Sequence, residues 1–258
     1  MTPSARPLYT VQLDIGGVAW EARVNDAPLF AEMQGLRTGT ELPLNRWIRN
    51  GANRFSYRLR PRPGQDGIPG NTRLSAVLYV RDWEADRQSR REVARVEYPG
   101  PTSVRDGETI LETAFQAQVP YPPFLWFASD TIAGGETTRL DLAREYGRFY
   151  EWAASRNLEA VVRAMAVRDR EDARANYASL GTQVANTRQT YGSLFNGGYE
   201  LRPDRTDAAH LRIYGEGRLA RLELSNGKPP LYYRASISMV AYLPLLFCRY
   251  RGAWTIIR

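Results

Sequence analysis

The second half of the chain, from Thr138 to Arg258, constrains the fold most, because its apolar period changes from helical to strand-like partway along. Apolar residues first recur at helical spacing, and a second helix is expected from Asn157. From Ala173 to Leu194 they alternate four and three apart, which predicts one long helix ending near Asn196. The face of the first of these helices consists of Leu142, Tyr146, Phe149, Tyr150 and Ala153.

Short strands are expected after these helices, separated by glycine and asparagine turns. Their expected ranges are 199–202, 210–214, 217–224, 231–234, 238–250 and 253–258. Pro244 inside the longest range indicates an edge strand or a bulge, because proline has no N–H to donate. Helices followed by antiparallel strands predict an α+β domain whose helices pack on a curved antiparallel sheet.

The first half instead predicts only strands, since β-branched and aromatic residues alternate between turn residues. Gly16-Gly17 between the first two ranges favours a hairpin. Seven short strands are typical of an antiparallel β-sandwich. The expected ranges are 9–14, 18–24, 54–60, 74–82, 92–98, 110–119 and 124–128.

The chain is long enough for two cores, with 258 residues. A proline-rich stretch begins at Pro120, and Ala133-Gly-Gly continues it, so the boundary is expected there. We predict a β-sandwich domain over 1–130, a linker over 131–137 and an α+β domain over 138–258.

The charge lies mainly in the second half, where nineteen Lys and Arg face thirteen acids within a total of +7. Such an excess suits an acidic partner. Only Lys228 among the thirty-five cations is a lysine, and the basic run 87–95 alternates with acids, so no nucleic-acid partner is expected. Absence of a long apolar run also predicts no membrane span.

Cys248 and His210 are each the only residue of their kind. A single cysteine permits neither an intramolecular disulfide nor a thiolate metal cluster, and Cys248 stands in an apolar run typical of a buried, inert thiol. We therefore expect no metal site and no cofactor.

Two segments of the first half, VNDAPLF from Val24 and ELPLNRWIRNGANRFSYRLRP from Glu41, resemble jelly-roll and immunoglobulin-like accessory domains of bacterial exported proteins. Asn50-Gly51 supplies a tight turn, and Asn53 is expected to hold the loop through side-chain bonds to the backbone. The strand that follows should point Phe55, Tyr57 and Leu59 inward. The resemblance implies sugar binding, but the sequence shows neither a calcium-type Asp cluster nor an exposed aromatic platform, so a scaffold or partner-docking role is favoured.

The second half resembles nuclear-transport-factor-two-like domains over about 120 residues. The segments that carry the likeness are YGRFYEWAASRNLEAV from Tyr146, LRIYGEGRLARL from Leu211 and LLFCRYRGAWTIIR from Leu245. The family implies a cone-shaped domain with a pocket. Its enzymatic branches hold an Asp–His or Tyr–Asp set there, whereas His210 has no acidic partner at fixed spacing.

A sandwich followed by a cone resembles exported proteobacterial proteins, some of them periplasmic immunity proteins of type VI secretion. That likeness implies a non-catalytic protein that binds a secreted toxin and occludes its active site, using aromatic and arginine anchors. The expected location is the periplasm, after removal of a signal peptide, with the cytoplasm as the alternative. The candidate anchors are Tyr232, Tyr233, Arg234, Arg249 and Arg251.

Two other functions stay open. One is a cone-pocket enzyme whose acid or base would be Tyr146, Tyr150, Asp141 or His210. The other is a small-molecule or carbohydrate-binding accessory protein. An enzyme needs titratable groups that converge in one cavity, a sugar binder needs an exposed aromatic shelf, and an inhibitor needs neither.

Overall fold

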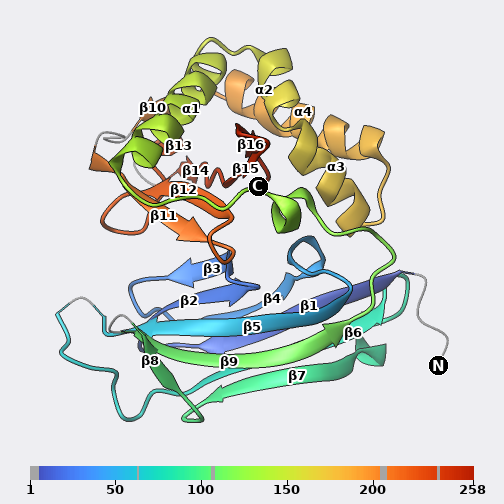
Figure 1. Ribbon diagram of the computed structural model, residues 1–258, viewed down its shortest axis with the longest axis vertical. Helices are drawn as coiled ribbons and strands as arrows, with labels where there is room; N and C mark the ends of the chain where they lie inside the picture. The colour runs from blue at the N-terminus through green and yellow to red at the C-terminus, as the bar shows by residue number, and fades with distance from the viewer. Residues whose placement is uncertain (1–5, 63, 106–107, 204–207, 237–238) are drawn as a thin grey trace. The chain divides into compact units, whose positions relative to one another are not determined.

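The computed structural model describes residues 6–62, 64–105, 108–203, 208–236 and 239–258. Within them the fold is α+β, with four α-helices and several antiparallel sheets (Figure 1). The chain separates into two compact units, Met1–Pro123 and Phe124–Arg258, and each is described by itself. None of the helices described is long and apolar enough to cross a membrane.

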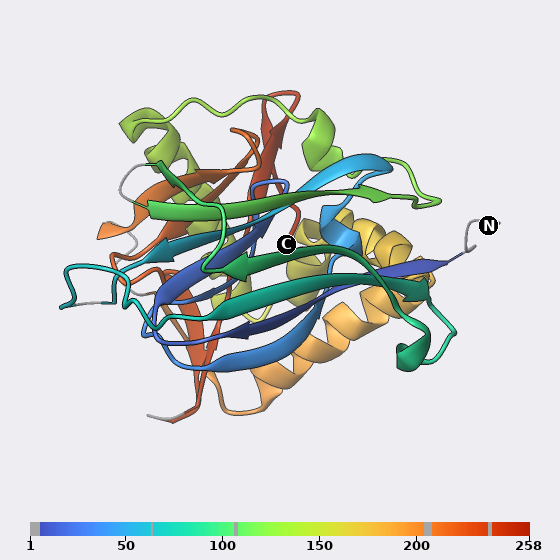
Figure 2. The same cartoon turned by 90° about the horizontal axis from the view of Figure 1, so that it is seen from below.

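The first unit contains two antiparallel sheets, ordered β4-β1-β6-β7 and β3-β2-β5-β9-β8 (Figure 2). A buried aromatic contact joins them: the rings of Tyr9 and Phe115 lie 6.4 Å apart, and the Tyr9 hydroxyl accepts from the Gln118 N–H at 2.9 Å. The strands are β1 Pro7–Ile15, β2 Ala19–Val24, β3 Ala27–Glu32, β4 Thr38–Pro43, β5 Gly51–Arg60, β6 Leu74–Asp82, β7 Arg91–Tyr98, β8 Ser103–Arg105 and β9 Glu108–Ala117.

The hairpin expected at Gly16-Gly17 is wrong. β1 pairs with β4 and β6, whereas β2 pairs with β3 and β5, so the two strands flanking these glycines lie in different sheets. The tight hairpin instead joins β2 to β3 through Asn25 and Asp26, whose φ angles of 51° and 61° suit a type I′ turn.

The expected role of Asn53 is confirmed. Its side-chain amide donates to the carbonyls of Arg49 at 2.8 Å and Gly51 at 2.9 Å, and its oxygen accepts from the Arg49 N–H at 3.0 Å. The strand in which it lies, β5, turns three side chains into the core, all of them fully buried: Phe55, Tyr57 and Leu59.

In the second unit the helices are α1 Glu136–Ala154, α2 Leu158–Ala164, α3 Ala166–Ala175 and α4 Leu180–Asn196. The single long helix expected across the last two is wrong. Tyr177 adopts a left-handed φ of 52°, which ends α3, and Ser179 starts α4 by accepting from the Thr182 N–H at 3.0 Å.

The strands of this unit form two sheets, ordered β10-β13-β14 and β11-β12-β15-β16. They are β10 Glu200–Pro203, β11 His210–Tyr214, β12 Leu219–Glu223, β13 Leu231–Arg234, β14 Val240–Tyr242, β15 Phe247–Tyr250 and β16 Ala253–Ile256. The single strand expected over 238–250 is therefore wrong: it is divided around Pro244, where the chain passes from one sheet to the other. Ser238, its expected first residue, lies outside the described residues.

Residues 124–137 belong to the second unit. The strand expected over 124–128 is wrong, because Leu125–Ala128 forms a 3₁₀ helix, η3. Backbone bonds attach the following residues to the sheet β11-β12-β15-β16: the Asp130 N–H donates to the Arg249 carbonyl and the Ile132 N–H to the Gly217 carbonyl, both at 2.7 Å. This stretch therefore forms part of the second unit's fold, although the sequence suggested the end of the first domain and a linker.

Candidate functional site

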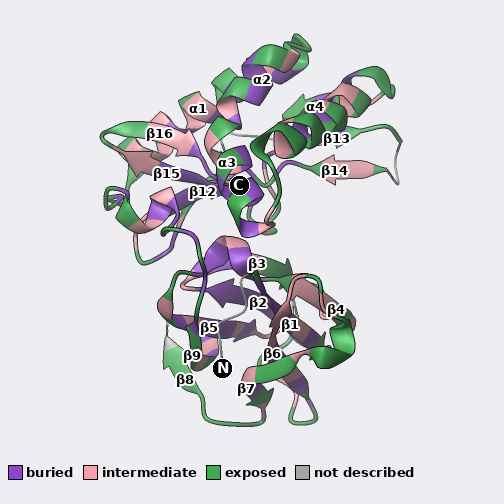
Figure 3. Ribbon diagram, turned by 90° about the vertical axis from the view of Figure 1, so that its right-hand side faces the viewer, coloured by how far each residue is buried: buried purple, intermediate pink, exposed green. Residues whose placement is uncertain are grey.

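One side of the sheet β10-β13-β14 carries exposed aromatic and basic side chains. Alternation along strands places every second residue on the same side, and the register aligns Arg202, Tyr232 and Tyr242 across the three strands. The two tyrosine rings lie 5.7 Å apart and are tilted by 48°. Figure 3 shows the partial exposure of β14, and Tyr242 is 38% exposed.

Basic groups surround this tyrosine pair. The Lys228 ammonium lies 5.3 Å from the centre of the Tyr242 ring, and Arg234 is exposed two residues along β13 from Tyr232. The one carboxylate in the same rows, Glu200, accepts from the Arg202 guanidinium at 2.6 Å. We call this surface the aromatic–basic face, which consists of Arg202, Lys228, Tyr232, Arg234 and Tyr242.

Such a face can form an interface but lacks an evident catalytic arrangement. Tyrosine and arginine are the residues most enriched at energetically dominant positions of protein interfaces, because they combine large contact area with hydrogen-bonding groups.

The five anchors suggested by the sequence do not lie together. Tyr232 and Arg234 are on the aromatic–basic face, whereas Tyr233, between them, points to the opposite side of β13 and is only 1% exposed. Arg249 and Arg251 lie in the β15–β16 hairpin of the other sheet.

That hairpin uses both arginines locally. The Arg249 guanidinium lies 5.7 Å from the Trp254 ring, and its Nε donates to the Gly252 carbonyl at 3.1 Å. Arg251 occupies a left-handed turn position, with φ of 50°, and its guanidinium lies 5.3 Å from the Tyr250 ring. Their immediate contacts are therefore with their own hairpin.

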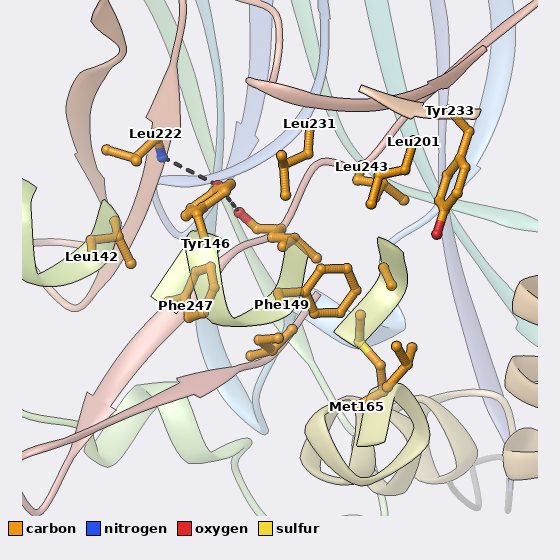
Figure 4. Packing of buried hydrophobic residues seen from close by; sticks show 14 of the residues in the cluster. Leu142, Tyr146, Phe149, Met165, Leu201, Leu222, Leu231, Tyr233, Leu243 and Phe247 are labelled. Atoms are coloured by element: carbon orange, nitrogen blue, oxygen red, sulfur yellow. Dashed lines mark hydrogen bonds between the residues drawn. The ribbon is translucent and has the colours of Figure 1, made fainter. Parts of the chain in front are cut away.

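Tyr146, a candidate acid or base for an enzyme, is part of the core (Figure 4). Its hydroxyl donates to the Leu245 carbonyl at 2.8 Å and accepts from the Leu222 N–H at 3.3 Å. Burial raises its pKa well above the usual value for tyrosine. These contacts attach α1 to β12 and to the segment between β14 and β15.

The other enzyme candidates lie apart from one another. His210 is exposed on β11, and its side chain has no hydrogen bond or ion pair with any described residue. Tyr150 is half-buried against the core, and Asp141 forms an ion pair at 2.6 Å with Arg144 on the exposed side of α1. The carboxylate opposite His210 in the register, Glu223, is bonded to Arg221 and Tyr214.

Sequence reasoning missed Arg202, Lys228 and Tyr242. The apolar run around Tyr242 indicates that it lies in a strand. It does not indicate that this strand, β14, pairs with β13 and so places Tyr242 beside Tyr232, because that pairing is non-local. In the described part of the chain, no three or more His, Cys, Asp and Glu side chains are grouped to hold a metal ion.

No protein-family model, curated protein or solved structure matches this chain.

Proposed function

We propose that this chain is a non-catalytic binding protein that docks an acidic protein surface on the aromatic–basic face. The observation that carries the proposal is the pair of the half-buried Tyr232 and the exposed Tyr242, flanked by three basic side chains. The tyrosines would supply buried contact area in the centre of the interface, and the cations would pair with carboxylates around it.

Charge supports an acidic partner. Arg202, Arg234 and Lys228 face outward with Glu200 as the one carboxylate in their rows, and Arg202 already neutralises that carboxylate. The second half of the chain also holds six of the seven excess positive charges. Complementary charge accelerates encounter and excludes basic competitors, so association should be faster at low ionic strength.

The partner that we propose is a secreted bacterial toxin whose active-site cleft is acidic, with this protein acting as its immunity protein. Occlusion of a cleft needs a preformed surface and no reacting group, which fits a face built on paired strands. A periplasmic location and a sandwich-plus-cone architecture resembling nuclear-transport-factor-two-like domains are parts of the same proposal.

Carbohydrate binding is less well supported by this face. Stacking on a sugar requires rings that present a flat surface, whereas the planes of Tyr232 and Tyr242 are inclined by 48°. A protein surface, which is uneven, suits that inclination better.

The test is affinity capture followed by protection. The wild-type protein, the double variant Tyr232→Ser with Arg234→Glu, and the control Arg148→Glu on the exposed side of α1 serve as baits for extracts of the source organism. We expect the wild type and the control to retain one partner in a stoichiometric amount, and the double variant to lose it. Co-expression should then show that wild type protects cells from the captured protein.

Two outcomes would contradict the proposal. Retention of the partner by the double variant would remove the aromatic–basic face from the interface. Capture of a partner that is harmless when expressed alone in the periplasm would leave binding intact and exclude immunity.

A further inference from the structure

One edge of the sheet β10-β13-β14 is open. β14 pairs with β13 on one side, and no described strand pairs with it on the other (Figure 3). Just after β14, the Leu243 N–H donates to the Leu231 carbonyl at 2.9 Å, so this residue directs its backbone groups at β13. Because hydrogen-bonded and non-hydrogen-bonded pairs alternate along antiparallel strands, the N–H and carbonyl groups of Tyr242 and Val240 point away from β13.

These outward backbone groups have no partner and stand among exposed residues. Neither Val240 nor Tyr242 forms a backbone hydrogen bond within the described chain. Tyr242 is 38% exposed and Met239 53%, Pro244 is also exposed, and Val240 is half-buried. Such an edge is a template for another strand, since its unpaired N–H and carbonyl groups can continue the ladder of hydrogen bonds.

The two edges of this sheet differ in their protection. Natural sheets block edge strands with charged side chains and proline, because an unprotected edge pairs with other chains. The opposite edge, β10, carries an ion pair between Glu200 and Arg202 and ends at Pro203. Residues 239–244 carry no charge, and their one proline, Pro244, follows the two residues whose backbone groups are open. At the β14 edge, therefore, neither charge nor proline opposes the addition of a strand to the open residues.

Cations lie beside this edge on one side of the sheet. Val240 and Tyr242 project to the aromatic–basic face, where Val240 is opposite Arg234 and the Lys228 ammonium lies 5.3 Å from the Tyr242 ring. An added strand would place every second side chain on this face, beside Lys228 and two strands, about 10 Å, from Arg234. A glutamate and an arginine side chain together span that distance. The side chain between two such positions would lie beside Ala241, which packs against the apolar core.

We propose that an extended, acidic segment of the protein partner adds to β14 as a further antiparallel strand, with acidic side chains at alternate positions and an apolar side chain between them. The inference rests on the acidic protein partner proposed above and specifies how it docks. A residue opposite Val240 in antiparallel pairing exchanges two backbone bonds with it, and the carboxylates face Lys228 and Arg234. A second copy of this chain fits less well, because pairing β14 with itself brings the same cations of two copies onto one sheet face.

The probe is the peptide acetyl-EVEVE-amide, added to the full-length, isotope-labelled protein in an NMR titration. In antiparallel pairing its glutamate N–H groups point to β14 and its valine N–H groups point away. We expect the amide signals of Val240 and Tyr242 to shift, with a Kd on the order of 0.1–10 mM for so short a peptide. The isomer acetyl-EEVVE-amide, which lacks the alternation, and the charge-reversed acetyl-KVKVK-amide should bind about tenfold more weakly or worse.

Methylation of single peptide nitrogens tests the backbone pairing directly. Methylating the amide nitrogen of the central glutamate removes a donor that faces β14 and places a methyl group in the ladder, so binding should weaken by roughly tenfold or more. Methylating the nitrogen of the valine that follows alters an amide that faces solvent, so the Kd should stay within about twofold. These two peptides have the same composition and charge.

The protein offers a matching pair of variants. Val240→Pro removes the outward N–H, and proline is tolerated at an edge position whose N–H faces solvent. It should weaken binding of acetyl-EVEVE-amide by roughly fivefold or more. Val240→Thr keeps the N–H and the β-branched shape and should bind the peptide as the wild type does. The amide spectrum of each variant reports whether its fold is preserved, and the methylated peptides need no variant at all.

Four results would overturn the proposal. They are no shift of the Val240 and Tyr242 signals up to 50 mM peptide (a limit roughly five times the weakest Kd expected), equal binding of the alternating peptide and its isomer, and equal binding of the two methylated peptides. The fourth is movement of these signals with protein concentration alone, which would identify a second copy of the chain as the occupant.

Failure of this proposal and failure of the proposed function give different results. If Val240→Pro captures the partner as the wild type does, while Tyr232→Ser with Arg234→Glu loses it, the face binds its partner without the edge and strand addition is wrong. If the peptide pairs with β14 as expected but the extract yields no partner, the edge accepts an acidic strand and the immunity function is wrong.

Discussion

At the scale of single residues, Asn53 shows how one polar side chain can determine a loop. It is 4% exposed, and both ends of its amide are used, including a bond of 2.8 Å from Asn25. Replacing it removes the partners of the part-buried backbone groups of Arg49 and Gly51 together, which is more costly than losing one exposed hydrogen bond. The sequence predicted this role because asparagine next to an Asn-Gly turn bonds readily to nearby backbone.

Asn53→Ala should lower the free energy of unfolding of the first unit by about 2–3 kcal/mol. Urea denaturation measures the change, with Gln116→Ala, an exposed polar residue of β9, as the control. Asn53→Asp keeps the acceptor but turns its second carboxylate oxygen toward the Arg49 and Gly51 carbonyl oxygens, so it should be at least as unstable as the alanine variant. If the alanine variant is as stable as Gln116→Ala, the side chain does not hold the loop.

Cys248 is fully buried on β15, as expected from its apolar surroundings. Burial raises the pKa of its thiol to about 12, so that at pH 8 roughly one molecule in ten thousand carries the reactive thiolate. The native protein should therefore not react with Ellman's reagent over an hour at pH 8. In roughly 6 M guanidinium, which unfolds most domains, the same protein should release one equivalent of thionitrobenzoate at once. Rapid reaction of the folded protein would show that β15 opens readily.

Glu171 on α3 joins this helix to both ends of the second unit. One carboxylate oxygen accepts from the Leu125 N–H at 2.5 Å and the other from Arg258 at 3.2 Å. Burial raises the pKa of this carboxyl above its reference value of 4.5, and Arg258 opposes the rise only in part. The folded protein therefore retains the proton to higher pH than the unfolded chain does.

From this difference the pH dependence follows. Between pH 4.5 and the folded pKa the folded state binds more protons, so the contribution of Glu171 to stability is complete below pH 4.5 and falls as pH rises through that window. Glu171→Gln cannot titrate, so its stability relative to wild type should increase from pH 4 to pH 7. Urea denaturation at several pH values measures this, with the exposed Glu151→Gln as the control for net charge. A difference that is constant with pH contradicts the assignment.

At the scale of elements, local patterns predicted the bounds of several strands but not their partners. The expected ranges 74–82, 210–214 and 231–234 agree with β6, β11 and β13 because alternation and turn residues are local signals. The prediction of a hairpin at Gly16-Gly17 was wrong because the pairing of a strand depends on contacts with strands that are distant in the sequence. For the same reason the sequence could not decide between Tyr232 and Tyr233: alternation separates them, but only the position of the core tells which one is exposed.

The apolar periodicity did not predict the break between α3 and α4. The apolar spacing continues across this break, but the Ser179 side chain caps the N-terminus of α4. One helix therefore ends at α3 and a separate helix begins. Ser179→Ala should lower the free energy of unfolding by about 1 kcal/mol, because the Thr182 N–H loses its acceptor. Ser193→Ala, an exposed position inside α4, is the control and should have little effect in the same thermal or urea denaturation experiment. Equal stability of the two variants would mean that the cap is unimportant.

At the scale of the whole molecule, the position of the boundary between the two units has a measurable consequence. Composition favoured a linker over 131–137, because a proline-rich stretch from Pro120 leads toward it and Gly134-Gly135 lies within it. Backbone bonds and buried side chains show instead that residues 124–137 are part of the second unit's fold. Phe124 is 1% exposed, Trp126 2% and Ile132 6%. A glycine-rich stretch can be ordered when its few apolar residues and its backbone N–H groups find partners.

Two fragments distinguish these boundaries. Residues 124–258 retain the segment that bonds to the β11–β12 turn and to β15, so this fragment should unfold cooperatively on heating and keep the amide spectrum of the second unit. Residues 138–258 lack three buried apolar side chains, each worth about 1.5–3 kcal/mol, and two backbone bonds to the sheet. Because that loss approaches the whole stability of a typical domain, the shorter fragment should show no cooperative transition. If it melts like the longer one, residues 124–137 are a linker after all and the boundary favoured by composition is correct.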